Sequence, residues 1–187
     1  MDYETIQAVL TSIDRAQPAE SCMPAIPPEK GVYSILVRSI SVLPSELARY
    51  QAETAFDAQV IYVGKGCGAE GLRQRLTRQD LRHIGASTFL RSLGAALGYM
   101  PPRGSLRGKK NQRNYRFTAQ DTAAIQRWIA FNLLVNFVIL RPQDVDAYEK
   151  RLIRNLKPGL NTEHNPEPCV YLRAARDRCI AIARAAC

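Results

Sequence analysis

Two short stretches, Gly31 to Arg38 (GVYSILVR) and Gln59 to Lys65 (QVIYVGK), decide the fold of this chain. Both are rich in β-branched and aromatic residues and are bounded by polar or glycine-containing segments, which is typical of short strands. We expect them to pair antiparallel. Residues 39–58 exceed a simple hairpin loop, and the Pro-Ser-Glu-Leu-Ala run that begins at Pro44 predicts a short helix inserted between the strands.

The remaining chain alternates helical patterns with one further strand. Apolar residues at helical spacing, with capping residues or helix breakers at several ends, recur in segments 4–13, 72–81, 88–97, 118–133, 142–157 and 170–185. Residues 135–140 (VNFVIL) predict a third strand. The pattern therefore predicts an α/β fold with a small, mainly antiparallel, three-stranded sheet flanked by helices and carrying N-terminal and internal helical elaborations.

Composition limits the class of protein. The 187 residues include 26 Lys plus Arg against 17 Asp plus Glu, a formal charge of +9, and 46% are hydrophobic, which is enough for one globular domain. No apolar run reaches the length of a membrane span, and the acidic N-terminus lacks the features of a secretion signal. Five scattered cysteines without a C-x-x-C pair fit a reducing compartment. We expect a cytoplasmic protein whose partners are polyanions.

Three fragments that follow one another along the chain carry recognisable motifs: Gly31-Val32-Tyr33, Ile61-Tyr62-Val63-Gly64-Lys65, and Glu149 to Asn161 (EKRLIRNLKPGLN). Together they resemble the GIY-YIG nuclease superfamily, which places its two tripeptides on adjacent strands. The family then has an arginine in the next helix, a metal-binding glutamate in a later helix and an asparagine beyond that helix. The resemblance implies six catalytic residues: Tyr33, Tyr62, Lys65, Arg75, Glu149 and Asn161.

The chain departs from the family pattern in two places. Residues 66–71 lengthen the path to the helical arginine, so Arg73 rivals Arg75, which we prefer because it precedes Leu76. The long separation between Arg75 and Glu149 indicates an insertion at about residues 83–130. The expected organisation is an N-terminal helix and linker (1–30), a catalytic domain (31–161) and a C-terminal helical extension (162–187).

The resemblance also implies roles for the six residues. Tyr33 would be the general base, assisted by Tyr62, with Lys65 and a nearby cation favouring the phenolate or a water-mediated proton transfer. Arg75 would clamp the scissile phosphate through its planar fork of donors. Glu149 would hold one Mg²⁺ or Mn²⁺, which accepts a single carboxylate because it keeps several waters. Asn161 would either orient the end of the glutamate helix or contact substrate.

A basic loop, residues 98–116, has six Lys or Arg and no acidic residue. Such a loop can be a solvated surface loop without a binding role, but in a nuclease we expect it to contact the nucleic-acid backbone. The candidate nucleic-acid-binding residues are Arg73, Arg103, Arg107, Lys109, Lys110, Arg113 and Arg116.

These features predict a metal-dependent endonuclease that hydrolyses DNA, with double-stranded DNA as the expected partner, in restriction, defence, an effector activity or DNA processing. Two alternatives remain open at this point. The chain could be a noncatalytic nucleic-acid-binding protein on the same scaffold, or a basic module bound by an acidic inhibitor or partner protein.

Overall fold

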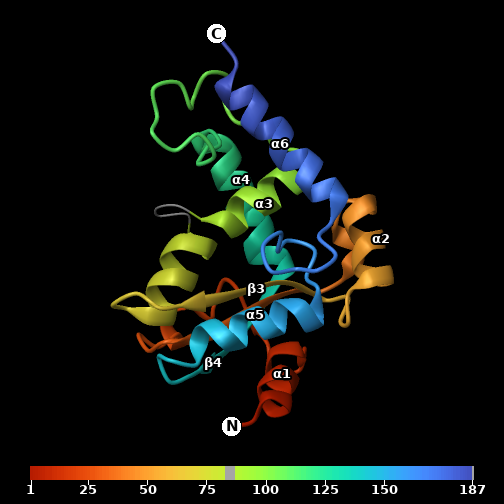
Figure 1. The fold of residues 1–187 in the computed structure, drawn as a ribbon, viewed down its shortest axis with the longest axis vertical. Coiled ribbons are helices and arrows are strands. Elements are labelled where there is room, and N and C mark those ends of the chain that lie inside the picture. The colour runs from red at the N-terminus through yellow and green to blue at the C-terminus, as the bar shows by residue number, and fades with distance from the viewer. Residues whose placement is uncertain (83–86, 187) are drawn as a thin grey trace.

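The computed structural model describes residues 1–82 and 87–186, and its centre is a four-stranded sheet in the order β1-β4-β2-β3 (Figure 1). All neighbouring strands pair antiparallel. The strands are β1 (Gln17–Pro18), β2 (Gly31–Val37), β3 (Val60–Gly66) and β4 (Leu133–Ile139). The expected α/β class and the three predicted strands are therefore present.

The expectation of a three-stranded sheet is wrong, because β1 adds an edge strand. Gln17 pairs with Val135 and Pro18 with Leu134. Two residues are too short to show the alternation that marks a strand, and a proline is compatible with a sheet only where its missing N–H is not needed, as at an edge. The pairing depends on how the N-terminal segment packs, which local pattern does not reveal.

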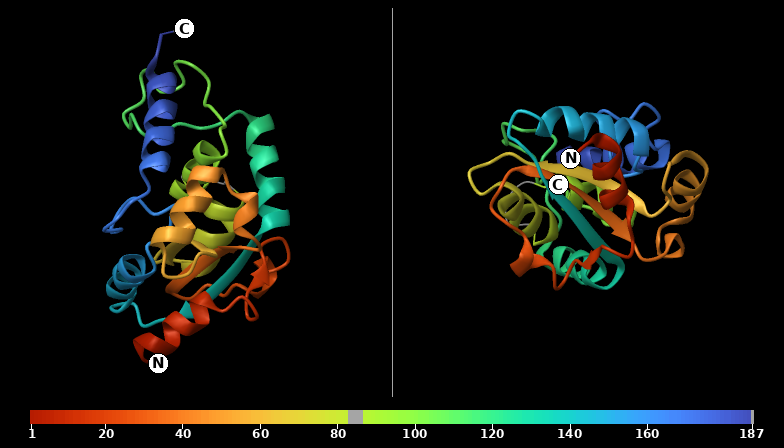
Figure 2. Two further views of the ribbon diagram at one scale, coloured as in Figure 1. Left: turned by 90° about the vertical axis from the view of Figure 1, so that its right-hand side faces the viewer. Right: turned by 90° about the horizontal axis from the view of Figure 1, so that it is seen from below.

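Helices cover both faces of the sheet (Figure 2). One face packs against α1 (Tyr3–Thr11) and α5 (Val145–Leu156). The other packs against the π-helix η3 (Arg73–Leu81), α3 (Thr88–Ala96) and α4 (Ala119–Asn132). The remaining helices are η1 (Met23–Ala25), η2 (Ile40–Val42), α2 (Ser45–Thr54) and α6 (Val170–Arg184). α6 lies against α3, outside the second helical layer.

Coverage on both sides explains the composition of β2, whose seven residues are all buried. Side chains alternate between the faces of a strand. Val32 and Leu36 therefore join the core beneath α1 and α5, whereas Tyr33 and Ile35 join the core beneath the opposite helices. The polar member, Ser34, donates its hydroxyl to the backbone carbonyl of Leu10 at 2.6 Å, which docks the end of α1 on the sheet.

The insertion expected at about residues 83–130 contains α3, the basic loop and most of α4, while residues 83–86 lie outside the described residues. The basic loop packs on the last turns of α6. The backbone N–H of Leu106 donates to the carbonyl of Ala183 at 2.9 Å, and the side chains of Leu106 and Tyr115 are buried. The loop therefore contributes to the core as well as to the surface.

None of the described helices combines the length and the apolar character that crossing a membrane would require.

Candidate active site

Five of the six predicted catalytic residues line one cavity of about 680 Å³: Tyr62, Lys65, Arg75, Glu149 and Asn161. They come from β3, from the π-helix η3, from α5 and from the segment that follows α5. The cavity is also lined by residues that no motif indicated, namely Thr88, Thr162, Glu163, His164 and Arg176, and by Arg113 of the basic loop. Tertiary folding thus gathers residues separated by more than a hundred positions.

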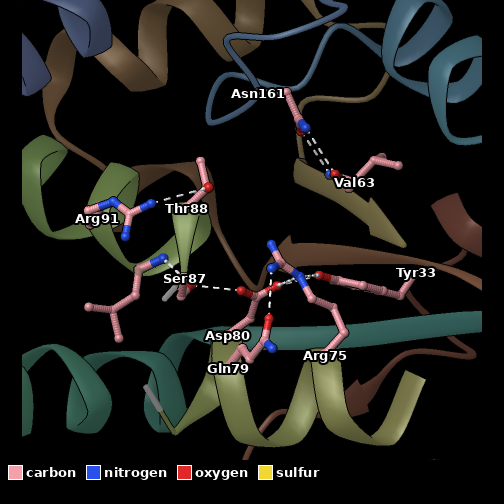
Figure 3. Close-up of polar contacts among 10 residues, drawn as sticks. Tyr33, Val63, Arg75, Gln79, Asp80, Ser87, Thr88, Arg91 and Asn161 are labelled. Carbon is pink, nitrogen blue, oxygen red and sulfur yellow. Dashed lines mark hydrogen bonds and ion pairs between the residues drawn. The ribbon is translucent and has the colours of Figure 1, made fainter. Parts of the chain in front are cut away.

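Tyr33, the sixth residue, is fully buried and does not line this cavity. It stands opposite Gly64 on β3, where any larger residue would collide with the tyrosine ring. Its hydroxyl donates to the Asp80 carboxylate and accepts a hydrogen bond from Arg75 Nε at 3.4 Å (Figure 3). Burial, reinforced by the negative charge of Asp80, raises the pKa of Tyr33 well above its usual value. The phenolate that the sequence expectation requires is therefore disfavoured here.

Asp80 is the centre of this buried network, and sequence reasoning missed it. Its carboxylate accepts from Tyr33 and from Ser87 Oγ at 2.7 Å, and it forms an ion pair with Arg75 at 3.4 Å (Figure 3). Burial raises the pKa of Asp80, and Arg75 offsets this only in part. Arg75 and Asp80 are five residues apart, a spacing that an α-helix places on different faces. The π-helix brings them closer because its hydrogen bonds run from i to i+5.

Tyr62 is the tyrosine on the cavity wall. Its ring packs 5.1 Å from Phe89 and 6.3 Å from Tyr33, measured between ring centroids. Burial raises the pKa of Tyr62, the charge of Asp80 adds to the effect, and Arg75 opposes it incompletely. Tyr62 is therefore a neutral phenol at pH 7 whose side chain reaches the cavity.

Lys65 pairs with carboxylates rather than with a tyrosine. Its Nζ lies 2.7 Å from Glu149 Oε2 and 2.8 Å from Asp146 Oδ1, one turn earlier in α5. Burial lowers the pKa of Lys65, but the hydrogen bonds to Asp146 and Glu149 outweigh it and the net shift is upward. Lys65 is thus a fixed positive charge next to the predicted metal ligand.

Glu149 suits a cation that needs few protein ligands. Among residues 1–82 and 87–186, no three His, Cys, Asp or Glu side chains converge on one point. The Glu149 side chain is 13% exposed and faces the cavity. A single carboxylate fits Mg²⁺ or Mn²⁺, because such ions retain waters and take further oxygens from a substrate phosphate. A dedicated all-protein cage would not fit these residues.

The side-chain amide of Asn161 forms hydrogen bonds with the backbone of β3. Its Oδ1 accepts from the Val63 N–H at 2.8 Å and its Nδ2 donates to the Val63 carbonyl at 2.9 Å (Figure 3). The neighbouring Leu160 N–H donates to the Ile61 carbonyl at 2.9 Å. These bonds tie the end of α5 to the strand that carries Tyr62 and Lys65. Of the two expected roles, this geometry favours orientation of the glutamate helix.

The structure separates the candidate arginines. Arg75 lines the cavity, whereas the Arg73 side chain is exposed and donates through Nε to the Ile26 carbonyl at 3.0 Å. Of the six Lys and Arg residues in the basic loop, only Arg113 lines the cavity. Lys109, Lys110 and Arg116 line a different hollow of about 530 Å³. Arg103 instead contacts the Ala186 carbonyl, and Arg107 lines neither hollow.

The GIY-YIG catalytic domain model matches residues 31–178, most of the chain. Together with the antiparallel α/β fold and the clustered residues, this match shows that the chain belongs to the GIY-YIG catalytic domain family. Members of this family are generally endonucleases. Comparison with curated proteins and with solved structures finds no significant match.

Proposed function

We propose that this protein is a divalent-metal-dependent endonuclease that hydrolyses phosphodiester bonds of double-stranded DNA. The observation that carries the proposal is the convergence of Tyr62, Lys65, Arg75 and Glu149 on one cavity in a chain of this family. The net charge of +9 supports a polyanionic substrate.

Hydrolysis of a phosphodiester needs a positioned water, stabilisation of the added negative charge and neutralisation of the leaving oxygen. Arg75 is suited to the second task. Its Nη1 donates to Gln79 Oε1 at 2.8 Å and its Nε donates to Tyr33, which holds the guanidinium in one orientation. A guanidinium has five N–H donors, so further donors are left for phosphate oxygens.

Tyr62, rather than Tyr33, is the tyrosine that contacts the attacking water. Tyr62 lines the cavity where substrate binds, whereas the Tyr33 hydroxyl is enclosed between Asp80 and Arg75. Tyr33 then serves as a positioning residue for Arg75. The Tyr62 phenol is neutral at pH 7, so its oxygen orients the water by accepting a hydrogen bond from it. It takes up the water's proton only if its own hydroxyl proton passes at the same time to a phosphate oxygen of the substrate.

Glu149 would hold Mg²⁺ or Mn²⁺, which when bound supplies the positive charge that acidifies a water and stabilises the leaving oxygen. Lys65 forms an ion pair with the Glu149 carboxylate, so a metal ion that binds Glu149 must displace the Lys65 ammonium from it. Asp146 provides the alternative partner, since it already bonds Lys65 and lies outside the cavity. The pair of carboxylates thereby keeps Lys65 near the substrate phosphate.

The test is cleavage of supercoiled, linear and single-stranded DNA and of RNA by the purified protein, with Mg²⁺, Mn²⁺ or a chelator. Glu149→Gln should abolish cleavage while DNA binding persists, because it removes the anionic ligand with little change in volume. Glu163→Gln is the matched control, since Glu163 also lines the cavity but its side chain is 88% exposed. Cleavage by Glu149→Gln at the parental rate would refute the metal assignment.

A further inference from the structure

One wall of the cavity carries positive charge without acidic partners. Arg176 on α6 donates through Nη1 to Thr162 Oγ1 at 3.2 Å, and Arg113 of the basic loop stands beside the same hollow. Within residues 1–82 and 87–186, neither guanidinium has a carboxylate within ion-pair distance. The acidic residues nearest to them are Glu163 and Asp177, and both are exposed. Glu163 Oε1 lies 3.8 Å from His164 Nε2.

A third arginine lies behind this wall. Arg91 on α3 is 7% exposed, and its Nη2 donates to the Thr88 hydroxyl at 3.4 Å. Among the residues that the structure describes, the Arg91 Nε has no hydrogen-bond partner. Burial lowers the pKa of Arg91, and the charge of Arg176 lowers it further. The charge of Asp80 raises the pKa of Arg91 and so opposes these effects in part. The hydrogen bonds and the ion pair of that carboxylate are nevertheless made with Tyr33, Ser87 and Arg75. A buried guanidinium with no ion-pair partner among residues 1–82 and 87–186 is costly, so this arrangement favours a bound anion in the neighbouring cavity.

The cavity continues into a second hollow along α6. That hollow, of about 360 Å³, shares Arg113, Thr162 and Arg176 with the cavity and adds Arg173, Asp177 and Ile180. The shared residues make the two spaces adjacent. Arg75 lines the cavity, Arg173 lines the second hollow, and Arg176 lines both.

We infer that Arg176, Arg113 and Thr162 form a second phosphate subsite, which binds a phosphodiester neighbouring the scissile one so that the DNA strand continues along α6. The inference rests on the proposed function, since it assumes a nucleic-acid substrate in the cavity. A phosphate would supply the missing negative charge and accept paired donors from the arginine forks. Thr162 follows the anchored Asn161, so the hydroxyl that holds Arg176 is itself set by β3.

The first experiment measures DNA affinity by fluorescence anisotropy with a short duplex in chelator, where no metal-dependent cleavage occurs. Arg176→Gln and Arg113→Gln are compared with Arg178→Gln, which removes the same charge from an exposed position on α6 that lines neither hollow. Arg176→Gln should weaken binding by about tenfold or more, the usual scale of a lost charge-assisted hydrogen bond. It should also reduce the magnitude of the log-affinity versus log-salt slope by about 0.9. Arg113→Gln should do the same, and Arg178→Gln should change neither quantity.

The second experiment separates anion binding from structural support. Inorganic phosphate should raise the melting temperature of the parental protein and of Arg178→Gln above that in chloride at equal ionic strength, but not that of Arg176→Gln. Without phosphate, Arg176→Gln should melt close to the parent, because relieved repulsion of Arg91 offsets the lost hydrogen bond to Thr162. Three results would each overturn the inference. The first is an equal loss of affinity in Arg176→Gln and Arg178→Gln, and the second is no loss of affinity in Arg176→Gln. The third is a lower melting temperature of Arg176→Gln together with unchanged DNA binding by Arg113→Gln.

The two proposals fail separately. If the binding pattern holds but no nucleic acid is cut with any metal, the subsite stands and the endonuclease assignment fails. If DNA is cut and Arg176→Gln binds like the parent, the endonuclease assignment stands and the subsite fails.

Discussion

Two arginines that are neighbours in sequence have different surroundings. Arg75 is fixed by Gln79, Tyr33 and Asp80 at the cavity, whereas Arg73 contacts a backbone carbonyl elsewhere. Arg75→Ala should lower single-turnover DNA cleavage by about a hundredfold or more, the usual cost of losing a donor to the developing charge. Arg73→Ala is the matched control and should cut at nearly the parental rate. A larger loss in Arg73→Ala would transfer the role of phosphate clamp to Arg73.

The two motif tyrosines should also respond differently to loss of the hydroxyl. Tyr62→Phe should keep the fold and lower single-turnover cleavage by about a hundredfold or more, the typical contribution of a positioned general base. Tyr33→Phe leaves the buried Asp80 without one of its donors. It should lower the free energy of unfolding by about 1–3 kcal/mol, the cost of an unsatisfied buried partner.

Urea denaturation and single-turnover kinetics on both tyrosine variants distinguish these effects. If Tyr62→Phe cuts like the parent while a fully folded Tyr33→Phe is inactive, the base would be Tyr33 after all.

At the scale of elements, the connection between α5 and β3 decides where Glu149 stands. Asn161 makes both of its hydrogen bonds to Val63 and is 7% exposed. Asn161→Ala leaves a buried N–H and a buried carbonyl unpaired, so it should lower the free energy of unfolding by about 2 kcal/mol or more. It should also slow cleavage, because α5 is released from the strand that carries Lys65.

The measurement is urea denaturation beside Asn114→Ala, which truncates an exposed asparagine of the basic loop. Equal stability of the two variants would contradict the anchoring role.

At the scale of the whole molecule, the positive charge of the basic loop is divided between two hollows. Arg113 belongs to the cavity, whereas Lys109, Lys110 and Arg116 line a separate hollow of the basic loop. Replacing these last three by Gln should weaken binding to unrelated DNA sequences, because phosphate contacts carry no base information. Each lost contact should reduce the magnitude of the salt slope by about 0.9 for duplex DNA. Cleavage at saturating DNA should change much less.

A control with the same charge change removes Arg15, Arg49 and Arg127, which are exposed on other elements. Equal effects of the two triple variants on affinity and salt slope would mean that only the net charge matters. Unchanged affinity in the basic-loop variant would support a solvated loop or an acidic protein partner.

The sequence by itself determined the family, the three longer strands and the set of motif residues. Strand alternation and helix periodicity are local properties, and the order of Tyr33, Tyr62, Glu149 and Asn161 is readable without coordinates. Because these residues were identified from the motif, five of the six predicted catalytic residues are found in one cavity. The two-residue β1 could not be predicted, because two residues are too short to show alternation and their partners on β4 lie more than a hundred positions away.

Only the tertiary structure decided which polar groups meet. Asp80 follows no motif, and its contact with Arg75 requires a π-helix that no residue pattern announces. Arg91, Thr162 and Arg176 come from α3, from the segment after α5 and from α6, and they become neighbours only when α6 packs on α3. Both motif tyrosines are buried, but only the tertiary arrangement shows that Tyr62 lines the cavity and Tyr33 does not. Such long-range packing is a property of the whole chain, so local spacing could not have indicated it.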